Sequence, residues 1–495
     1  MTEQQQTTAV GQLPNTGTKS TSLAPRVFTC VVWALCVASL GVLVARFVVD
    51  GAWTLPGVAA VDGLTAVMWV VVTFFSGIVH SYSRRYMAGS RTIDRFFGGV
   101  FAFTLAVMVL VAADHVALFA AAWVAMGIVM ADLIGHVRGW PQAQAAATLA
   151  RRYFLASGAL LTVALVTLWL STGATTVSGI VAAADTVPQT AWLVAAGALL
   201  LAAMIQSALV PFHTWLLSSM TAPTPASALM HAGFVNAGGV LLVRFAPVVT
   251  ADAQFMLLLL AVGATSALLG KLLKTVQSDV KRQLGCSTVG QMGFMIMQAG
   301  LGFFGAALTH LVLHGFYKAY QFLSAGEQVE QTAPGKADSQ SAGVLGAGVA
   351  LLSALAGGAV FAALTGKGTH FDSGLLLAGL VVLTTLHATR TAVAQTDLPA
   401  AVRFGAVPVV FLPAIAVYAL AYNLVHALLV DVPVVTAPAD LTLVHGVVAA
   451  AFLAVYVAIE RGAYEHSQRL YVALLNLSQP PSDTVLTAKE DYNEY

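Results

Sequence analysis

Charged residues are scarce in this chain. Only 9% of its 495 residues are Asp, Glu, Lys or Arg, whereas 58% are hydrophobic. A soluble domain carries about 25% charged residues, so the composition excludes a soluble enzyme, a nucleic-acid-binding protein and a disordered scaffold. What remains is a helical protein that crosses a membrane many times.

The chain also has few cysteines and almost no net charge. The three cysteines (Cys30, Cys36 and Cys286) are too few, and too apolar in their surroundings, for a disulfide framework or a closed zinc site. The net charge of +1 gives no sign of a polyanionic partner. No stretch between the apolar segments is long enough for a soluble catalytic domain. We therefore expect no catalytic domain and no cofactor of its own in this chain.

Long apolar runs dominate the sequence. A membrane-spanning helix needs about 20 mostly apolar residues, and about fourteen segments qualify, which predicts an all-α polytopic membrane protein. The predicted segments are 27–45, 62–80, 96–113, 115–135, 153–171, 192–217, 224–248, 254–272, 284–303, 304–325, 343–365, 373–389, 404–428 and 440–459.

Lys and Arg concentrate in the loops after the second, fourth, eighth and twelfth segments. The positive-inside rule places these loops, and with fourteen spans both termini, in the cytoplasm. The first 25 residues are polar and are expected to be disordered. They lack the cationic start and cleavage site of a signal peptide, so the first span is expected to stay in place. Residues 469–477 predict a short helix along the membrane interface or against a partner.

The segment 304–325 carries three ionisable residues. His310, His314 and Lys318 are spaced four apart and therefore lie on one helix face. An ionisable side chain at membrane depth costs at least ~2.5–3.5 kcal/mol on insertion scales, which makes each of them a functional candidate. Histidine titrates near neutrality, so this stripe, bridged by water, predicts a proton relay. The alternatives are satisfied core histidines or a metal or bis-histidine haem site. No acidic residue completes the histidine pair for a metal, and haem ligands usually come from separate helices.

A second polar group lies in the two segments 192–217 and 224–248. Pro211 predicts a break or kink in its helix, close to Gln206. Transporters use broken helices at mid-depth to expose backbone dipoles to ions, although a kink near the membrane surface is the simpler alternative. His231 adds another titratable group at membrane depth.

Further candidates lie nearer the segment ends. Asp132 is close to the predicted cytoplasmic end of its segment, so it is either interfacial or functional. Asp279 and Lys281 belong to a basic loop that serves as a positive-inside anchor or as an ion entrance. Lys367 and His387 are candidates in weaker sequence contexts.

Several blocks resemble the antiporter-like subunits, which comprise the largest membrane subunit of respiratory complex I and its MrpA relatives. The likeness covers roughly residues 58–430, and the blocks occur in the order of the family. They are residues 78–82, 86–87, 212–215, 222–231, 277–288, 310–318 and 384–390.

The resemblance implies two inverted five-helix repeats, formed by the third to seventh and the eighth to twelfth segments. Each repeat contains a broken helix, at Pro211 and around residues 356–358. It also implies that His231, His310, His314 and Lys318 match the central proton path, Lys281 the basic residue of an Asp-x-Lys-Arg turn, and Lys367 the distal lysine. The domain division that follows is 1–25, 26–95, 96–250, 251–390, 391–460 and 461–495.

Two departures from complex I change the expected function. Val124 stands where complex I subunits have Glu after Trp, and Gln206 stands where they carry lysine. Asp132, eight residues or ~12 Å further along the helix, replaces the lost carboxylate only partly. A chain of this length without the Glu–Lys pair resembles the DabB family, the membrane subunits of the DAB inorganic carbon uptake systems. Their partner DabA is a large protein with a carbonic-anhydrase-like zinc site.

The sequence thus predicts a proton- or cation-conducting subunit of the bacterial inner membrane. Ion flow would be coupled to CO2 and bicarbonate uptake by a DabA-like zinc-binding partner on the cytoplasmic side. The alternatives are a proton-translocating subunit of a quinone-, NADH- or hydrogenase-linked respiratory complex, an Mrp-type Na+/H+ antiporter subunit, and a structural anchor whose channel is inactive.

Overall fold

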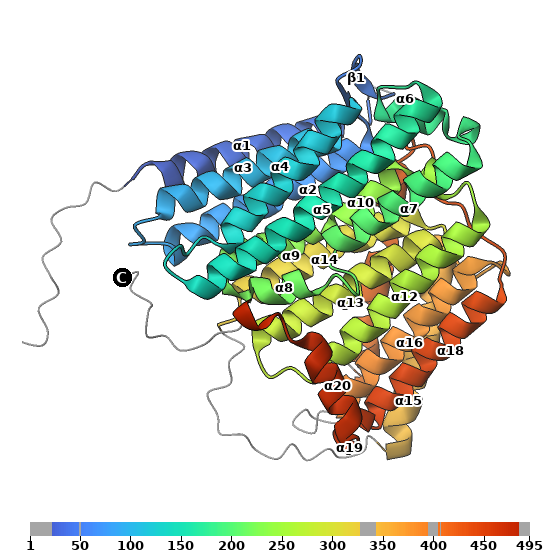
Figure 1. Ribbon diagram of the computed structural model, residues 1–495. Helices are drawn as coiled ribbons and strands as arrows, with labels where there is room; N and C mark the ends of the chain where they lie inside the picture. The colour runs from blue at the N-terminus through green and yellow to red at the C-terminus, as the bar shows by residue number, and fades with distance from the viewer. Residues whose placement is uncertain (1–21, 49–50, 327–342, 395–403, 406, 485–495) are drawn as a thin grey trace, which may run out of the picture.

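The computed structural model describes residues 22–48, 51–326, 343–394, 404–405 and 407–484. Long helices lie side by side in a tilted bundle (Figure 1). A hairpin of two short strands, β1 (Trp53–Leu55) and β2 (Ala59–Val61), lies at one end of the bundle, which we call the β end. The opposite end, which carries helix α20 (Gln468–Ser478), is the α20 end.

The first half of the chain forms six long helices and several short ones. Consecutive helices pack together, because the connections between α2, α3, α4 and α5 are short. The helices are α1 (Ala24–Ala45), α2 (Gly63–Tyr86), α3 (Ile93–Ala112), α4 (Val116–Ile134), α5 (Pro141–Thr172), α6 (Val177–Ala182), η1 (Ala184–Thr186), α7 (Gln189–Gln206), α8 (Thr214–Ser218), η2 (Ser219–Thr221), α9 (Thr224–Ala232), η3 (Phe234–Asn236), α10 (Ala237–Arg244) and α11 (Ala246–Val249).

The second half forms seven long helices and a short helical tail. They are α12 (Ala253–Thr275), α13 (Val280–Gly300), α14 (Phe304–Leu323), α15 (Gly343–Thr365), α16 (Ser373–Ala394), α17 (Val407–Leu428), α18 (Leu443–Glu460), α19 (Ala463–His466), α20 and η5 (Ser482–Thr484).

The helices have the length and composition of membrane spans. Within the described ranges, twelve helical segments are long and apolar enough to cross a membrane, with α9 to α10 taken as one. The other two predicted segments, 284–303 and 304–325, coincide with α13 and α14, which carry more polar residues. The predicted all-α polytopic architecture is therefore confirmed. The division into two inverted repeats stays a prediction.

Helices α12 and α13 approach each other most closely through glycines. A Cβ atom on Gly270 would lie 2.2 Å from the backbone nitrogen of Gly290, and one on Gly293 would lie 2.4 Å from that of Ala267. Small residues let helix backbones approach where lipid supplies no hydrophobic driving force. This contact holds α13 in the bundle despite its polar residues.

The chain is interrupted where Pro211 stands. Helix α7 ends at Gln206, and an irregular segment leads to α8. Ser207 Oγ donates to the carbonyl of Val235 (2.6 Å), and Trp215 Nε1 donates to that of Ile205 (2.9 Å). These bonds satisfy carbonyls around the break, as irregular backbone at membrane depth requires.

The prediction of a second helix break around residues 356–358 is wrong. Helix α15 runs without interruption through both glycines there. A Cβ on Gly357 would lie 2.5 Å from Ile415 Cδ1, and one on Gly358 would lie 2.4 Å from Val382 Cγ2. These glycines serve close packing against α17 and α16. A second interruption lies instead between α9 and α10, where Asn236 Nδ2 donates to the carbonyl of Ala232 (2.7 Å).

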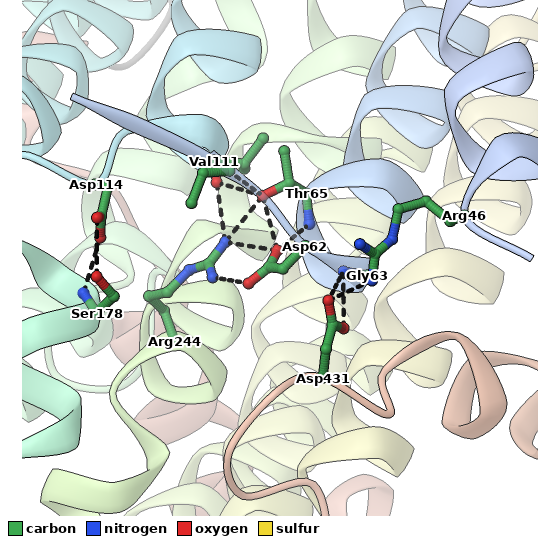
Figure 2. Close-up of polar contacts among 10 residues, drawn as sticks. Arg46, Asp62, Gly63, Thr65, Val111, Asp114, Ser178, Arg244 and Asp431 are labelled. Atoms are coloured by element: carbon green, nitrogen blue, oxygen red, sulfur yellow. Dashed lines mark hydrogen bonds and ion pairs between the residues drawn. The ribbon is translucent and has the colours of Figure 1, made fainter. Parts of the chain in front are cut away.

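Two ion pairs join distant parts of the chain at the β end (Figure 2). Arg244, at the end of α10, pairs with Asp62 and donates to the carbonyl of Val111 (2.9 Å). Arg46, after α1, pairs with Asp431, which also accepts from the backbone nitrogen of Gly63 (3.0 Å). The connection between α17 and α18 is thereby tied to α1 and α2.

The short helix predicted over residues 469–477 corresponds to α20, which packs against α12. His213 Nε2 hydrogen-bonds the carbonyl of Leu477 (2.9 Å), and Gln277 Nε2 donates to Ser478 Oγ (2.8 Å). The tail therefore lies next to the interrupted α7–α8 segment. Most of the N-terminal segment predicted to be disordered (residues 1–25) lies outside the described residues. All of the last eleven residues lie outside them as well.

Candidate functional site

Helix α14 presents the predicted stripe of ionisable residues. The rings of His310 and His314 are nearly parallel (14°), with centroids 6.0 Å apart, as a spacing of four residues requires. His314 is 5% exposed, and Lys318, one turn further, is fully buried. The structure thus brings the three side chains onto one inward face of α14.

A chain of hydrogen bonds leads from this stripe to His231. Lys318 Nζ donates to the carbonyl of Leu284 in α13 (2.8 Å). The same carbonyl accepts from Thr288 Oγ1 (2.9 Å), and Thr288 Oγ1 is 2.9 Å from His231 Nδ1 in α9. Three helices therefore share one polar connection through the apolar bundle.

Several polar groups in and next to this connection lack an ion-pair or hydrogen-bond partner among the described residues. Across the described part of the chain, Lys318 makes no ion pair with a carboxylate. No hydrogen-bond partner is present there for either ring nitrogen of His314, or for Nε2 of His310 and His231. Buried polar groups normally have a partner, so these nitrogens are open to a partner that the described residues do not supply.

A cavity of about 560 Å³ borders the stripe. His310 and His314 line it from α14, Lys271 and Lys274 from α12, and His387 from α16. Because Lys271, Lys274 and His387 lie near the C-terminal ends of their helices, the cavity extends from the two histidines toward the α20 end.

The corresponding region of the first half is less polar. Gln206, the last residue of α7, is fully buried, and neither amide atom has a partner among the described residues. Val124 packs against α5, where a Cβ on Gly158 would lie 2.6 Å from its Cγ2. At the two positions where the resemblance to complex I leads us to expect a Glu–Lys pair, the structure has an aliphatic side chain and an amide.

Three predicted residues lie outside the buried stripe. Asp132 is on the surface and pairs with Arg151 (2.7 Å). Asp279 is exposed and caps α13 by accepting from the backbone nitrogen of Arg282 (2.8 Å). Lys281 Nζ donates to the carbonyl of Ala222 (3.3 Å), near the start of α9. Their part in an ion path stays a prediction.

Lys367 lies in the loop between α15 and α16, close to the start of α14. Its Nζ is 4.1 Å from the ring centroid of Phe303 and 4.6 Å from that of Tyr422. Burial lowers the pKa of Lys367 to about 8, an effect that Asp372 opposes. Lys367 therefore marks the β end of α14, opposite the end that carries Lys318.

Sequence reasoning missed Thr288 and the carbonyl of Leu284. A hydroxyl that bonds the carbonyl four residues earlier is common in helices and indicates no function by itself. Only the distance to His231, 57 positions away in the chain, gives Thr288 its place in the connection. The one available signal was its position within the block 277–288.

Two family descriptions match the chain. "NADH:quinone oxidoreductase/Mrp antiporter, TM" covers residues 113–342, which include His231, His310, His314 and Lys318. "NADH-Ubiquinone oxidoreductase (complex I), chain 5 N-terminus" covers residues 51–97.

Curated relatives are similar over about half of the chain or more. A probable inorganic carbon transporter subunit, DabB1 of Halothiobacillus neapolitanus, is 39% identical over 290 residues, which are 56% of this chain and 51% of the relative. DabB of Bacillus subtilis, with the same description, is 37% identical over 322 residues, 64% of this chain and 63% of the relative. The chain thus spans about half to somewhat under two thirds of these relatives.

The fold is similar to that of a solved structure, the Mrp complex from a Dietzia species. The superposition covers 92% of this chain and 50% of the other, with a TM-score of 0.57 and 22% sequence identity. At this identity the likeness concerns the fold alone. It supports the arrangement of helices described above.

Proposed function

We propose that this chain is an antiporter-like membrane subunit, related to the complex I and Mrp proteins that it matches, and that it conducts protons or another cation through its bundle. The observation that carries the proposal is the fully buried Lys318, linked through Thr288 to His231 and adjacent to a cavity lined by His310 and His314.

A buried ammonium is costly when, as among the described residues, no carboxylate pairs with it. The presence of Lys318 at this position therefore favours a role for its charge. His310, His314 and Lys318 relay the ion along α14. His231 and Gln206 hydrate or gate the region of the interrupted helices. Asp132, Asp279, Lys281 and Lys367 are secondary candidates near the two ends of the path.

We further propose that the ion flow drives inorganic carbon uptake. The curated relatives are named inorganic carbon transporter subunits, and the proposed partner is a DabA-like zinc protein that converts CO2 to bicarbonate. One charge crossing ~100 mV releases ~2.3 kcal/mol, enough to bias such a cycle. We propose a bacterial inner membrane location with the partner on the cytoplasmic side. The positive-inside distribution supports the cytoplasmic placement of the α20 end and of both termini.

The test is Lys318→Met in the full chain. We expect it to abolish complementation of growth at ambient CO2 and to lower proton flux in proteoliposomes by about 10²-fold or more, the usual contribution of a proton-transfer group. Arg152→Met, which removes an exposed charge from α5, is the control and is expected to leave both unchanged. Normal growth and flux of Lys318→Met at equal protein level would contradict the proposal.

A second candidate is a subunit of an Mrp-type Na+/H+ antiporter or of a respiratory complex, which the complex I and Mrp family matches favour. Sodium-dependent growth at alkaline pH would identify the antiporter. Flavin or iron–sulfur absorbance in the purified complex would identify the respiratory subunit. A chain without any ion flux would be a structural anchor.

A further inference from the structure

A second polar cluster lies where α12, α16 and α18 meet near the α20 end. His387 Nδ1 is 2.8 Å from Glu460 Oε1, and Lys271 Nζ is 3.2 Å from His387 Nε2. Arg390 Nε is 3.5 Å from the other Glu460 oxygen. Both ring nitrogens of His387 are therefore in contact with a charged group, one of each sign.

This cluster borders the same cavity as the stripe on α14. His387 and Lys271 line the cavity of about 560 Å³ together with His310 and His314. The side chain of Glu460 is 19% exposed and that of His387 31% exposed. One side of the cluster is thus accessible from outside, and the other borders the cavity that His310 and His314 line.

We propose that His387 is a proton-exchanging residue at the α20-end entrance of the ion path, positioned by Glu460 and Lys271. The inference rests on the proposed function and deepens it, because it assigns an entrance to the route along α14. Neither Glu460 nor Lys271 belongs to the buried stripe, and Glu460 lies outside the residues matched by either family description.

The chemistry follows from the two sides of the ring. Imidazole accepts a proton at one nitrogen and releases one from the other. The Glu460 carboxylate stabilises the doubly protonated ring, whereas the Lys271 ammonium repels a proton from it. The His387 ring thus lies between Glu460, which attracts a second proton to it, and Lys271, which repels that proton. We infer that the ring passes protons between Glu460 and the cavity. Arg390 contacts Glu460, and the ring of Tyr456 lies next to that of His387. The other titratable groups that line the same cavity are Lys274, His310, His314, Tyr317 and Tyr418.

The test is His387→Ala in the reconstituted full chain, with imidazole added as a diffusible proton carrier. We expect flux to fall by about 10²-fold, as for loss of a proton-transfer group. Added imidazole should restore much of the flux, because the space left by the missing ring adjoins the cavity and can admit it. An equal concentration of a buffer without an imidazole ring should restore none. A merely structural histidine would not respond to imidazole.

Glu460→Gln tests the positioning residue, with Glu465→Gln on the neighbouring helix α19 as the control. We expect reduced flux for the first and unchanged flux for the second. Two results would overturn this inference alone, provided that the wild-type chain conducts. One is normal flux in His387→Ala, and the other is a loss of flux in folded His387→Ala that imidazole does not restore. A wild-type chain without flux overturns the proposed function and this inference with it.

Discussion

Thr288 connects two helices through one hydroxyl group. Its Oγ1 lies between the carbonyl of Leu284 and the ring of His231 (2.9 Å to each), and Lys318 shares the same carbonyl. At the residue scale, the proposed path therefore depends on a side chain that cannot ionise. A hydroxyl both donates and accepts, so Thr288 donates to the Leu284 carbonyl and can accept from His231, which holds the imidazole and the ammonium around one carbonyl.

We predict that Thr288→Val lowers proton flux by roughly 10- to 100-fold, because valine keeps the shape but removes the bridge. Thr288→Ser should retain most of the flux. Proteoliposomes with an internal pH dye provide the measurement. Thr309→Val is the matched control, since Thr309 is buried in α14 and bonds a carbonyl four residues earlier (2.8 Å). Equal flux in Thr288→Val and Thr309→Val would contradict a role for the hydroxyl.

Lys367 gives the folded protein a pH dependence of stability. Its pKa is lowered from 10.5 to about 8 by burial, against the opposing effect of Asp372. Between these values the unfolded chain binds more protons than the folded one, so stability rises with pH. From about pH 7 to pH 10, the wild type should gain about 1–3 kcal/mol relative to Lys367→Met.

Thermal unfolding in detergent at several pH values measures this difference. Groups other than Lys367 titrate in both proteins and cancel when the variant is subtracted. Parallel pH profiles of the two proteins would show that Lys367 is as accessible to water when folded as when unfolded.

At the element scale, the glycines of α12 and α13 decide how closely the two helices pack. A Cβ on Gly293 would meet the backbone of Ala267 at 2.4 Å. Since backbone atoms have no alternative rotamer, the helices must separate to accommodate it. That separation would also move Leu284 and Thr288 relative to Lys318.

We predict that Gly293→Ala destabilises the protein by about 1–3 kcal/mol through overpacking. Gly379→Ala in α16 is the control, because nothing lies within 4 Å of its added Cβ, and alanine is there expected to be neutral or stabilising by up to about 1 kcal/mol. Thermal unfolding of both variants in the same detergent measures the difference. A lower unfolding temperature for Gly379→Ala than for Gly293→Ala would refute the packing argument.

The sequence also predicted elements more reliably than contacts between them. The stripe on α14 follows from a spacing of four within one helix, which any helix reproduces. Glycines at 357–358 are ambiguous, because the same residue type suits a break or a close approach, and only the neighbours Ile415 and Val382 decide between them. The pairs Thr288–His231 and His387–Glu460 join residues 57 and 73 positions apart, and no local periodicity predicts such a contact.

At the scale of the whole molecule, the β-end ion pairs connect the beginning of the chain to its later helices (Figure 2). Asp431 accepts from Arg46 and from the backbone nitrogen of Gly63, so one carboxylate joins the α17–α18 connection to α1 and α2. Its side chain and that of Arg46 are 16% and 8% exposed. A pair so far removed from water leaves an uncompensated charge when one partner is lost.

We predict that Asp431→Asn lowers stability by about 3–5 kcal/mol, the usual cost of breaking a buried pair. The double variant Arg46→Met, Asp431→Asn should lose less, because it removes the unpaired cation as well. Asp132→Asn is the matched control: its pair with Arg151 is about half exposed, and such pairs contribute about 0–1 kcal/mol. Thermal unfolding in detergent measures all three. Equal losses for Asp431→Asn and Asp132→Asn would mean that the two ends of the chain are held together by apolar packing rather than by this pair.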